Sequence, residues 1–113
     1  MHEMSLMENV RQIIEDAAAE QQFSRVKTIW LELGELSCAE PEAMRFCFDV
    51  VMQHSIAQQA RLEIVRTPGS GWCANCSRTV TISALYEPCP ACGNHAINIT
   101  GGDAMRVREL EVE

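Results

Sequence analysis

Two Cys-x-x-Cys pairs limit what this chain can fold into more than any other feature. The first pair is Cys73 and Cys76, the second is Cys89 and Cys92, and twelve residues separate the two pairs. A Cys-x-x-Cys turn points two sulfur atoms to one side, at the separation that a tetrahedral ion needs, and two such turns on facing hairpins complete the shell. The spacing therefore predicts a closed zinc site that holds the ion structurally and leaves no open position for a substrate.

The segment that carries these cysteines is too short to hold a core of its own. Val80 and Ile82 alternate as in a short strand between the pairs, and Gly93 follows the last cysteine, where a tight turn often needs a positive φ. We therefore expect metal binding to supply much of its folding free energy. The alternative is a thioredoxin-like redox pair, but that function needs only one Cys-x-x-Cys, placed at the start of a helix after a βαβ pattern.

Charge and length argue against several classes of function. Of the 113 residues, 16 are acidic and 9 are basic, so the net charge is −7. The basic side chains are spread along the chain, whereas a nucleic-acid binder needs a positive stripe that displaces phosphate counterions. No stretch has the length and apolarity to cross a bilayer, and the start, MHEMSLMENVR, lacks the basic region of a signal peptide. We therefore expect a cytoplasmic protein that binds neither nucleic acid nor membranes and whose paired cysteines hold metal.

Apolar periodicity predicts two helices in the first half of the chain. Ser5 and Glu8 form a capping-box pattern, so the first helix is expected to begin near Leu6 and to leave residues 1–4 projecting free of it. Its buried stripe is expected to contain Met7, Val10, Ile14 and Ala17, widened by Ile13 and Ala18. A second helix is expected from Pro41 to about His54. Its core face is expected to contain Met44, Cys47, Phe48 and Val51, broadened by Phe46 and Val50.

Strand patterns alternate with these helices. Apolar and β-branched residues over 25–33 predict one strand, and the alternation over 61–66 predicts a second. Pro68-Gly69-Ser70-Gly71 is then expected to be a short linker to the cysteines, and Gly101-Gly102 marks a second break after them.

A terminal strand over 105–112 has to pair with something, and the earlier sheet is the obvious partner. The chain is therefore expected to have an α+β fold with an inserted zinc-ribbon-like module. Residues 1–67 and 103–113 are expected to form one domain, and residues 68–102 are expected to form the zinc-binding module between two of its strands.

The start of the chain, Met1-His2-Glu3, offers a second set of metal ligands. A histidine in second place normally prevents removal of the methionine, so the Met1 amine, the His2 amide nitrogen and the His2 imidazole can chelate one ion. Such a nitrogen-rich, near-planar set suits Ni(II) or Cu(II) better than Zn(II), and Glu3 could add its carboxylate or its amide. A histidine at this position is otherwise typical of a solvated tail, and the residues alone leave both interpretations open.

Five segments, taken in order, resemble the HypA/HybF family of hydrogenase maturation proteins. They are MHEMSL, LELGELSCAEPEAMRFCFDVV, ARLEIV, WCANC and CPACG, and the match covers essentially the whole chain. The resemblance implies a three-stranded mixed sheet with two helices on one side and an attached zinc module. It also implies a nickel site at His2, assisted by Met1 and Glu3, with the four paired cysteines as zinc ligands.

The function that the resemblance implies is nickel delivery and not catalysis. Family members pass nickel towards the large subunit of NiFe hydrogenase, working with a HypB-type GTPase, and some also serve urease. His95 is the one further histidine near the zinc module that the resemblance allows as a ligand of either metal. We expect a monomer or a weak homodimer, and the sequence does not decide between the HypA and HybF paralogues.

Two other classes of function compete with this interpretation. A zinc ribbon that binds nucleic acid or a transcription complex is typical of such cysteine pairs, but residues 68–102 contain only Arg78 as a base, offset by Glu87. A zinc hydrolase or deaminase needs an open metal position and an H-x-E signature, which the sequence lacks. Nickel delivery with a structural zinc site explains the sequence better than either class.

Overall fold

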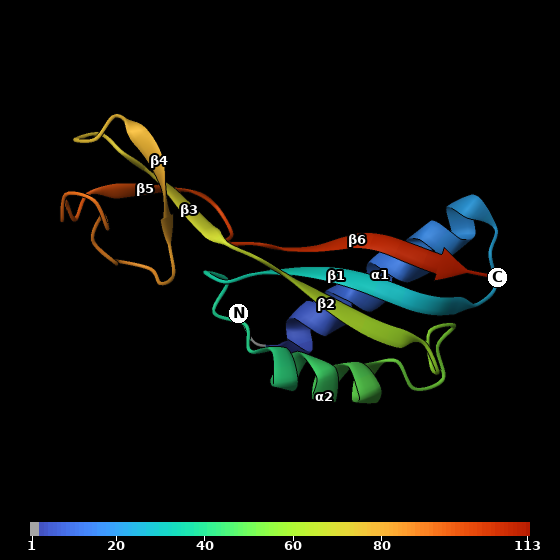
Figure 1. Cartoon of the computed structure of the whole chain (residues 1–113). Helices are drawn as coiled ribbons and strands as arrows, with labels where there is room; N and C mark the ends of the chain where they lie inside the picture. The colour runs from blue at the N-terminus through green and yellow to red at the C-terminus, as the bar shows by residue number, and fades with distance from the viewer. Residues whose placement is uncertain (1–2) are drawn as a thin grey trace. The chain divides into compact units, whose positions relative to one another are not determined.

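The structure is a computed structural model that describes residues 3–113 (Figure 1). Over these residues the chain forms two helices and two three-stranded sheets, which confirms the predicted fold class. The elements follow in the order α1 (Glu3–Gln21), β1 (Val26–Gly34), α2 (Pro41–Val51), β2 (Arg61–Thr67), β3 (Gly69–Cys73), β4 (Arg78–Ile82), β5 (Ile97–Gly101) and β6 (Met105–Val112). Neither described helix is long and apolar enough to cross a membrane.

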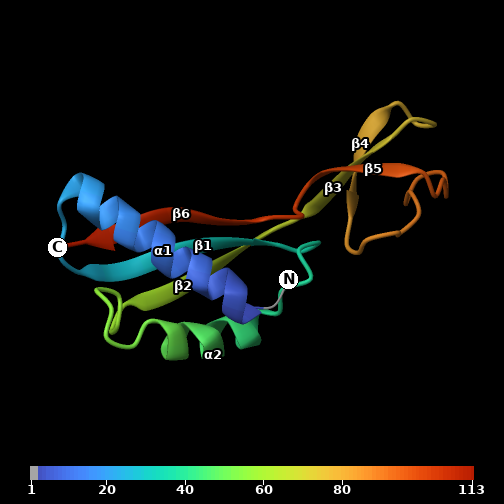
Figure 2. The same ribbon diagram turned by 180° about the vertical axis from the view of Figure 1, so that it is seen from behind.

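The first sheet is mixed and has the strand order β2-β1-β6. β6 runs antiparallel to β1, because the Gly34 amide donates to the Ala104 carbonyl at 3.0 Å and the Glu113 amide donates to the Arg25 carbonyl at 3.0 Å. β2 runs parallel to β1, since α2 carries the chain back between these two strands. Both helices lie on one side of the sheet, and α1 crosses in front of it in Figure 2.

α1 begins earlier than the capping pattern predicts. Glu3 and Met4 are helical, so the expectation that they project free of the helix was wrong, whereas Met1 and His2 lie outside the described residues. A carboxylate in the first turn is favourable because it complements the positive end of the helix dipole. The Glu3 carboxylate also accepts a hydrogen bond from the main-chain amide of Glu40 at 3.1 Å. Ser5 therefore lies inside the first turn and not at the cap.

α2 begins at Pro41, as predicted, and its N-cap is Glu40. The Glu40 carboxylate accepts a hydrogen bond from the Ala43 amide at 3.0 Å. The helix ends at Val51, earlier than expected from the apolar pattern. The hydroxyl group of Ser55 donates to the Met52 carbonyl at 2.7 Å just beyond this end.

The buried faces of the helices are narrower than predicted. Met7, Val10 and Ile14 of α1 are buried, as are Met44, Cys47 and Phe48 of α2, which confirms the centre of each predicted stripe. The predicted widening was wrong at Ile13, Phe46 and Val50, which are 46, 67 and 42 % exposed, whereas Ala18 is half-buried. These three apolar side chains therefore face solvent in the described chain.

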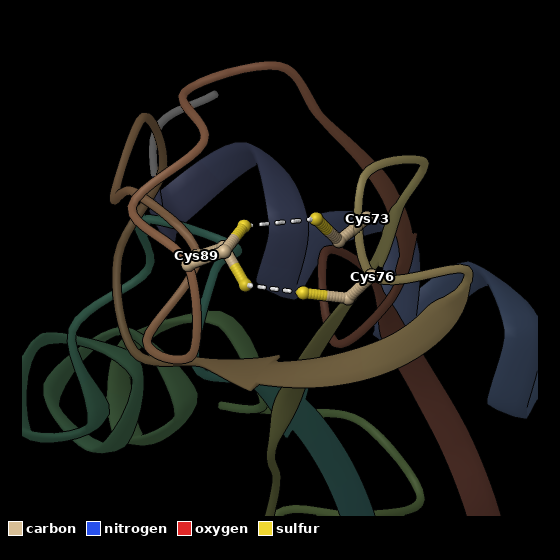
Figure 3. A group of neighbouring side chains, drawn as sticks. Cys73, Cys76 and Cys89 are labelled. Carbon is tan, nitrogen blue, oxygen red and sulfur yellow. Dashed lines mark hydrogen bonds between the residues drawn. The ribbon is translucent and has the colours of Figure 1, made fainter.

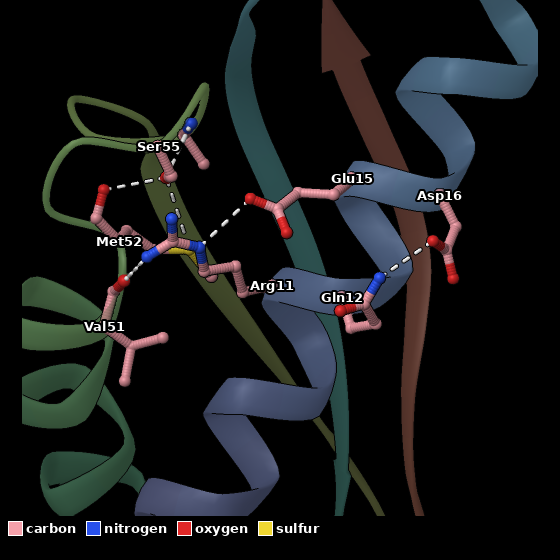
Figure 4. Close-up of polar contacts among 8 residues, drawn as sticks. Arg11, Gln12, Glu15, Asp16, Val51, Met52 and Ser55 are labelled. Atoms are coloured by element: carbon pink, nitrogen blue, oxygen red, sulfur yellow. Dashed lines mark hydrogen bonds and ion pairs between the residues drawn. The ribbon is translucent and has the colours of Figure 1, made fainter.

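Arg11 links α1 to α2 (Figure 4). Its Nη1 atom donates to the Val51 carbonyl at 2.7 Å, and its Nε atom donates to the Glu15 carboxylate at 3.1 Å. The last carbonyl groups of a helix have no partner within that helix, so this hydrogen bond satisfies one of them at the end of α2. Arg11 therefore fixes the end of α2 to the middle of α1.

The described chain divides into two compact units. The first contains the residues up to Leu31, together with Ala39–Val65 and Arg106–Glu113. The second contains Glu32–Cys38 and Arg66–Met105. The second unit is thus made of two segments, of which the shorter one comes from the end of β1 and the loop that follows it.

The second unit contains an antiparallel sheet with the order β4-β3-β5. β3 occupies the centre of this sheet and begins at Gly69, so the prediction of a linker over residues 68–71 was wrong. Glycine is required there for close packing: a Cβ atom on Gly69 would lie 2.5 Å from the Ile82 carbonyl oxygen, and one on Gly71 would collide with the Ile97 side chain. The segment whose composition resembles a flexible linker is therefore part of a strand with close neighbours.

Candidate metal centre

The four paired cysteines lie in two turns of the second unit (Figure 3). Cys73 is the last residue of β3, and Cys76 follows in the turn that leads into β4. Cys89 and Cys92 lie in the turns between β4 and β5. Because β3 pairs with both β4 and β5, the second pair of cysteines returns to the end of β3 that carries the first pair.

The sulfur atoms have the spacing of a tetrahedral metal site. All four Sγ atoms lie within 4.8 Å of one another. The distance from Cys73 Sγ to Cys92 Sγ is 3.6 Å, and that from Cys76 Sγ to Cys89 Sγ is 3.9 Å. Four sulfur ligands at about 2.3 Å from a tetrahedral zinc ion are about 3.8 Å apart, whereas a disulfide holds its sulfur atoms at about 2.05 Å. The donor set and its geometry therefore fit zinc and do not fit disulfides.

The backbone after each pair turns in the same way. Ser77 follows Cys76 with φ = +53°, and Gly93 follows Cys92 with φ = +78°, which confirms the positive φ predicted for Gly93. The Gly93 amide donates to the Cys89 carbonyl at 2.8 Å and closes the second turn. These tight turns bring the two sulfur atoms of each pair to the same side.

Hydrogen bonds to the sulfur atoms favour the thiolate form at two positions. The Asn75 side chain and the Asn94 main-chain amide lower the pKa of Cys92 to about 6. The main-chain amide of Cys76 is the largest of the groups that lower the pKa of Cys73. By contrast, the hydrogen bond with Cys92 and burial raise the pKa of Cys76 to about 12. Binding of a metal ion therefore has to displace protons from this cluster, as is general for thiolate ligands.

Leu36 completes the apolar core beside the sulfur atoms. The buried residues of this core are Leu36, Cys73, Val80, Ile82 and Cys89. Leu36 is 4 % exposed and is held there because its amide donates to the Gly102 carbonyl at 2.7 Å. Sequence reasoning missed this residue, because a single leucine in a loop carries no periodicity and lies far along the chain from the cysteines. The metal centre thus depends on the loop after β1.

The residues predicted for the nickel site are only partly described. Met1 and His2 lie outside the described residues. Glu3 is described, and its carboxylate accepts a hydrogen bond from the Glu40 amide. His95 is exposed and does not belong to the group of four cysteines, so its role as a ligand stays a prediction.

The whole chain matches known sequences. A family model described as "Hydrogenase/urease nickel incorporation, metallochaperone, hypA" matches residues 1–112. The chain is 56 % identical, over all 113 residues and the full length of each relative, to proteins named "Hydrogenase maturation factor HypA" from Rhodopseudomonas palustris (strain BisA53) and Albidiferax ferrireducens. A protein of the same name from Azotobacter chroococcum is 50 % identical over the same length.

Two solved structures have a similar fold. One is described as the solution structure of the Ni metallochaperone HypA from Helicobacter pylori, with a TM-score of 0.76 and 27 % identity over 99 % of this chain and 97 % of that chain. The other, described as the solution structure of HypA protein, has a TM-score of 0.73 and 27 % identity over 100 % of this chain and 97 % of that one.

Proposed function

The chain belongs to the HypA family of nickel-incorporation metallochaperones, and on that premise we propose that it binds Ni(II) at its N-terminus and delivers it for the maturation of NiFe hydrogenase. The observation that carries this proposal is the match of the nickel-incorporation family model to residues 1–112, which includes the Met1-His2-Glu3 start. Nickel is the cargo of this protein, so the N-terminal ligands have to bind it and release it again.

The nickel ligands that we propose are the Met1 amine, the His2 amide nitrogen and the His2 imidazole. Glu3 is the one proposed contributor whose side chain is described. Its carboxylate accepts the hydrogen bond from Glu40, so it has to give up that bond before it can bind the ion. Its own main-chain amide could serve instead without disturbing α2. His95 is a further proposed ligand, since it is exposed and belongs to the unit that holds the cysteines.

The ion that we propose for Cys73, Cys76, Cys89 and Cys92 is Zn(II), in a structural role. Four thiolates fill a tetrahedral shell, so a substrate finds no open position on the ion. The buried sulfur atoms of Cys73 and Cys89 belong to the core of the second unit, which supports a role in folding. We accordingly assign no enzymatic activity to this centre.

The two compact units have different roles in this proposal. In this proposal the first unit, including the N-terminal segment, carries the nickel site, and the second unit carries the zinc site. The partners proposed from family membership are a HypB-type GTPase, the precursor of the hydrogenase large subunit and, in organisms that make it, the urease maturation proteins. We also propose a cytoplasmic location for this chain.

Calorimetric titration of nickel at neutral pH tests the proposal. The zinc-loaded native chain is compared with His2→Ala and with a matched control, His54→Ala, because His54 is exposed and lies outside both proposed sites. We expect about one nickel per chain for the native protein and for the control, and none at the N-terminal site of His2→Ala, with zinc content the same in all three. Equal nickel binding by His2→Ala and the native protein would reject the N-terminal site.

A further inference from the structure

The four cysteines of the proposed zinc site differ in how far solvent can reach them. Cys73 and Cys89 are buried, Cys76 is half-buried, and Cys92 is exposed. A small reagent in solution therefore meets Cys92 before it meets the other three. The thiolate is both the form of cysteine that binds a metal ion and the form that attacks electrophiles, so Cys92 combines access with reactivity when the site is loaded.

Cys92 has a reaction partner in the other Cys-x-x-Cys pair. Its Sγ atom lies 3.6 Å from Cys73 Sγ, and Cys76 Sγ lies 3.9 Å from Cys89 Sγ. Each of these two contacts joins the first turn to the second. A disulfide bond holds its sulfur atoms at about 2.05 Å, so Cys73 and Cys92 are separate thiols in this structure that need only a small approach to be joined.

The main chain keeps the two turns facing each other without help from the sulfur atoms. Cys73 is fixed by its place at the end of β3, which pairs with both β4 and β5. In the second turn the Cys89 amide donates to the Asn94 carbonyl at 2.8 Å, and the Gly93 amide donates to the Cys89 carbonyl at 2.8 Å. The Asn94 side chain also donates to Cys73 Sγ at 3.8 Å. The contact between Cys73 and the turn that carries Cys92 is therefore built into the fold.

We propose that Cys92 is a site of oxidation by hydrogen peroxide, and that its oxidation leads to a disulfide with Cys73 and to loss of zinc. The inference rests on the structural zinc site proposed above and adds a reaction to it. Access selects Cys92 as the residue that is attacked first, and the contact across the two turns selects Cys73 as its partner. Cys38 is exposed as well, but it does not belong to the cluster.

The first step consumes one molecule of peroxide. The Cys92 sulfur atom attacks one peroxide oxygen, so an S–O bond forms while the O–O bond breaks. The sulfur atom gives up two electrons, which the peroxide accepts, and the hydroxide that leaves takes up a proton and becomes water. Cys92 is then a sulfenic acid, which is the first and reversible stage of cysteine oxidation.

The second step uses the thiolate of Cys73 and no further oxidant. Its sulfur atom attacks the sulfur atom of Cys92, so the S–S bond forms while the S–O bond breaks, and the hydroxide that leaves takes up a second proton. Cys76 and Cys89 then remain as the only thiolates of the cluster. Two thiolates do not close a tetrahedral shell, so we expect zinc to be released.

The new disulfide links the same two turns that the metal ion linked. It joins the end of β3 to the second turn, and such a cross-link stabilises a fold mainly by restricting the unfolded chain. A thiol reductant can attack this bond and return both cysteines to the thiolate form. The oxidation is therefore reversible, and the reduced chain is expected to take up zinc again.

Peroxide treatment of the zinc-loaded full chain, followed by mass spectrometry, tests the proposal. The zinc content is measured first: a chain without zinc overturns both the zinc site and this inference, whereas a loaded chain that resists peroxide overturns this inference alone. We expect a chromogenic chelator to detect zinc release as one peroxide is consumed per chain. Dimedone, which labels sulfenic acids, is expected to mark Cys92 in early samples and neither Cys73 nor Cys89.

Tryptic peptides identify the disulfide. Trypsin cuts after Arg66, Arg78 and Arg106, so the first cysteine pair lies in the peptide 67–78 and the second pair lies in the peptide 79–106. We expect these two peptides to be joined through Cys73 and Cys92, with the other two cysteines open to alkylation. A disulfide confined to the peptide 79–106, or zinc release with only sulfinic acid at Cys92, overturns the proposed pairing.

Two variants test the role of Cys92. Cys92→His keeps a zinc ligand at this position, since three cysteines and one histidine also form structural zinc sites. We expect peroxide to release its zinc about tenfold more slowly or less, because the exposed thiolate is gone. Cys38→Ser is the matched control and is expected to release zinc as fast as the native chain. Equal rates for Cys92→His and the native chain would show that another cysteine is oxidised first and would overturn the assignment.

Discussion

The carboxylate of Glu3 accepts a hydrogen bond from the main-chain amide of Glu40 at 3.1 Å, and so joins the start of α1 to the start of α2. The residue next to the proposed nickel ligands is thus also part of the polar network that begins α2. Glu40 is the N-cap of α2, and its own carboxylate accepts a hydrogen bond from the Ala43 amide. Any use of the Glu3 carboxylate as a ligand therefore competes with a contact inside the fold.

Substitution of Glu3 separates these two roles. Glu3→Gln keeps an oxygen acceptor for the Glu40 amide, so we expect the free energy of unfolding to stay nearly unchanged. Glu3→Ala removes the acceptor, and we expect a loss of about 1 kcal/mol or less, because this hydrogen bond is exposed to solvent. Urea unfolding measures the free energy of unfolding of both variants. If the Glu3 carboxylate binds nickel, we expect calorimetry to show a lower nickel affinity for both variants. If the main-chain amide of Glu3 binds nickel instead, we expect the affinity of both variants to be unchanged.

Loss of one cysteine ligand is expected to unfold the second unit. Cys73 is fully buried, and its sulfur atom is one of the four that we propose as zinc ligands. We expect Cys73→Ser to lose its zinc and to lose hydrogen-exchange protection in β3, β4 and β5, while α1 and α2 stay protected. Cys38→Ser is the control, since Cys38 is exposed and does not belong to the cluster. Full protection of β3 in zinc-free Cys73→Ser would show that the ion is dispensable for folding.

Leu36 is expected to matter to the metal centre although it is no ligand. Leu36→Ala removes a buried side chain from the core that contains Cys73 and Cys89, and such truncations cost about 2–5 kcal/mol. The second unit is expected to lose zinc to a chelator more readily, as measured by competition with a chromogenic chelator. Leu85→Ala is the matched control because Leu85 is 38 % exposed. Equal zinc retention by the two variants would argue against a contribution of Leu36.

Two glycines with similar backbone angles are expected to respond differently to substitution. Gly102 has φ = +76°, and a Cβ atom there would lie 2.6 Å from Gly69 Cα, so Gly102→Ala meets both strain and a collision. Gly93 has φ = +78° with nothing within 4 Å, so Gly93→Ala meets only the strain. We expect a loss of about 1 kcal/mol for Gly93→Ala and clearly more for Gly102→Ala, by thermal unfolding. Gly93→Asn is expected to be tolerated best, because asparagine adopts this conformation readily.

The features that the sequence predicts well are those that neighbouring residues determine. A Cys-x-x-Cys turn brings its own two sulfur atoms together, so each half of the cluster follows from spacing, and the pairing of β3 with β4 and β5 joins the halves. Strands such as β1 and β2 follow from periodicity, and the start of α2 at Pro41 follows from the special backbone of proline. These signals are local, and the structure confirms them.

The predictions that failed depend on contacts between distant residues. The helical state of Glu3 is supported by Glu40, and the strand at Gly69 exists because β4 and β5 flank it. Leu36 reaches the cysteine core through a hydrogen bond to Gly102. Composition over residues 68–71 suggests flexibility only because it does not show which neighbours require the small side chains. No pattern within a short window carries such information.

The position of β6 in the sheet has a consequence for the entropy of folding. β1 and β6 are neighbours in one sheet, although α2, β2 and the longer segment of the second unit lie between them in the sequence. The entropic cost of bringing two strands together grows with the length of flexible chain between them. The Gly34 amide and the Ala104 carbonyl, which bond to each other, both belong to the second unit, so an ordered second unit already holds the ends of β1 and β6 together and lowers this cost for the first unit.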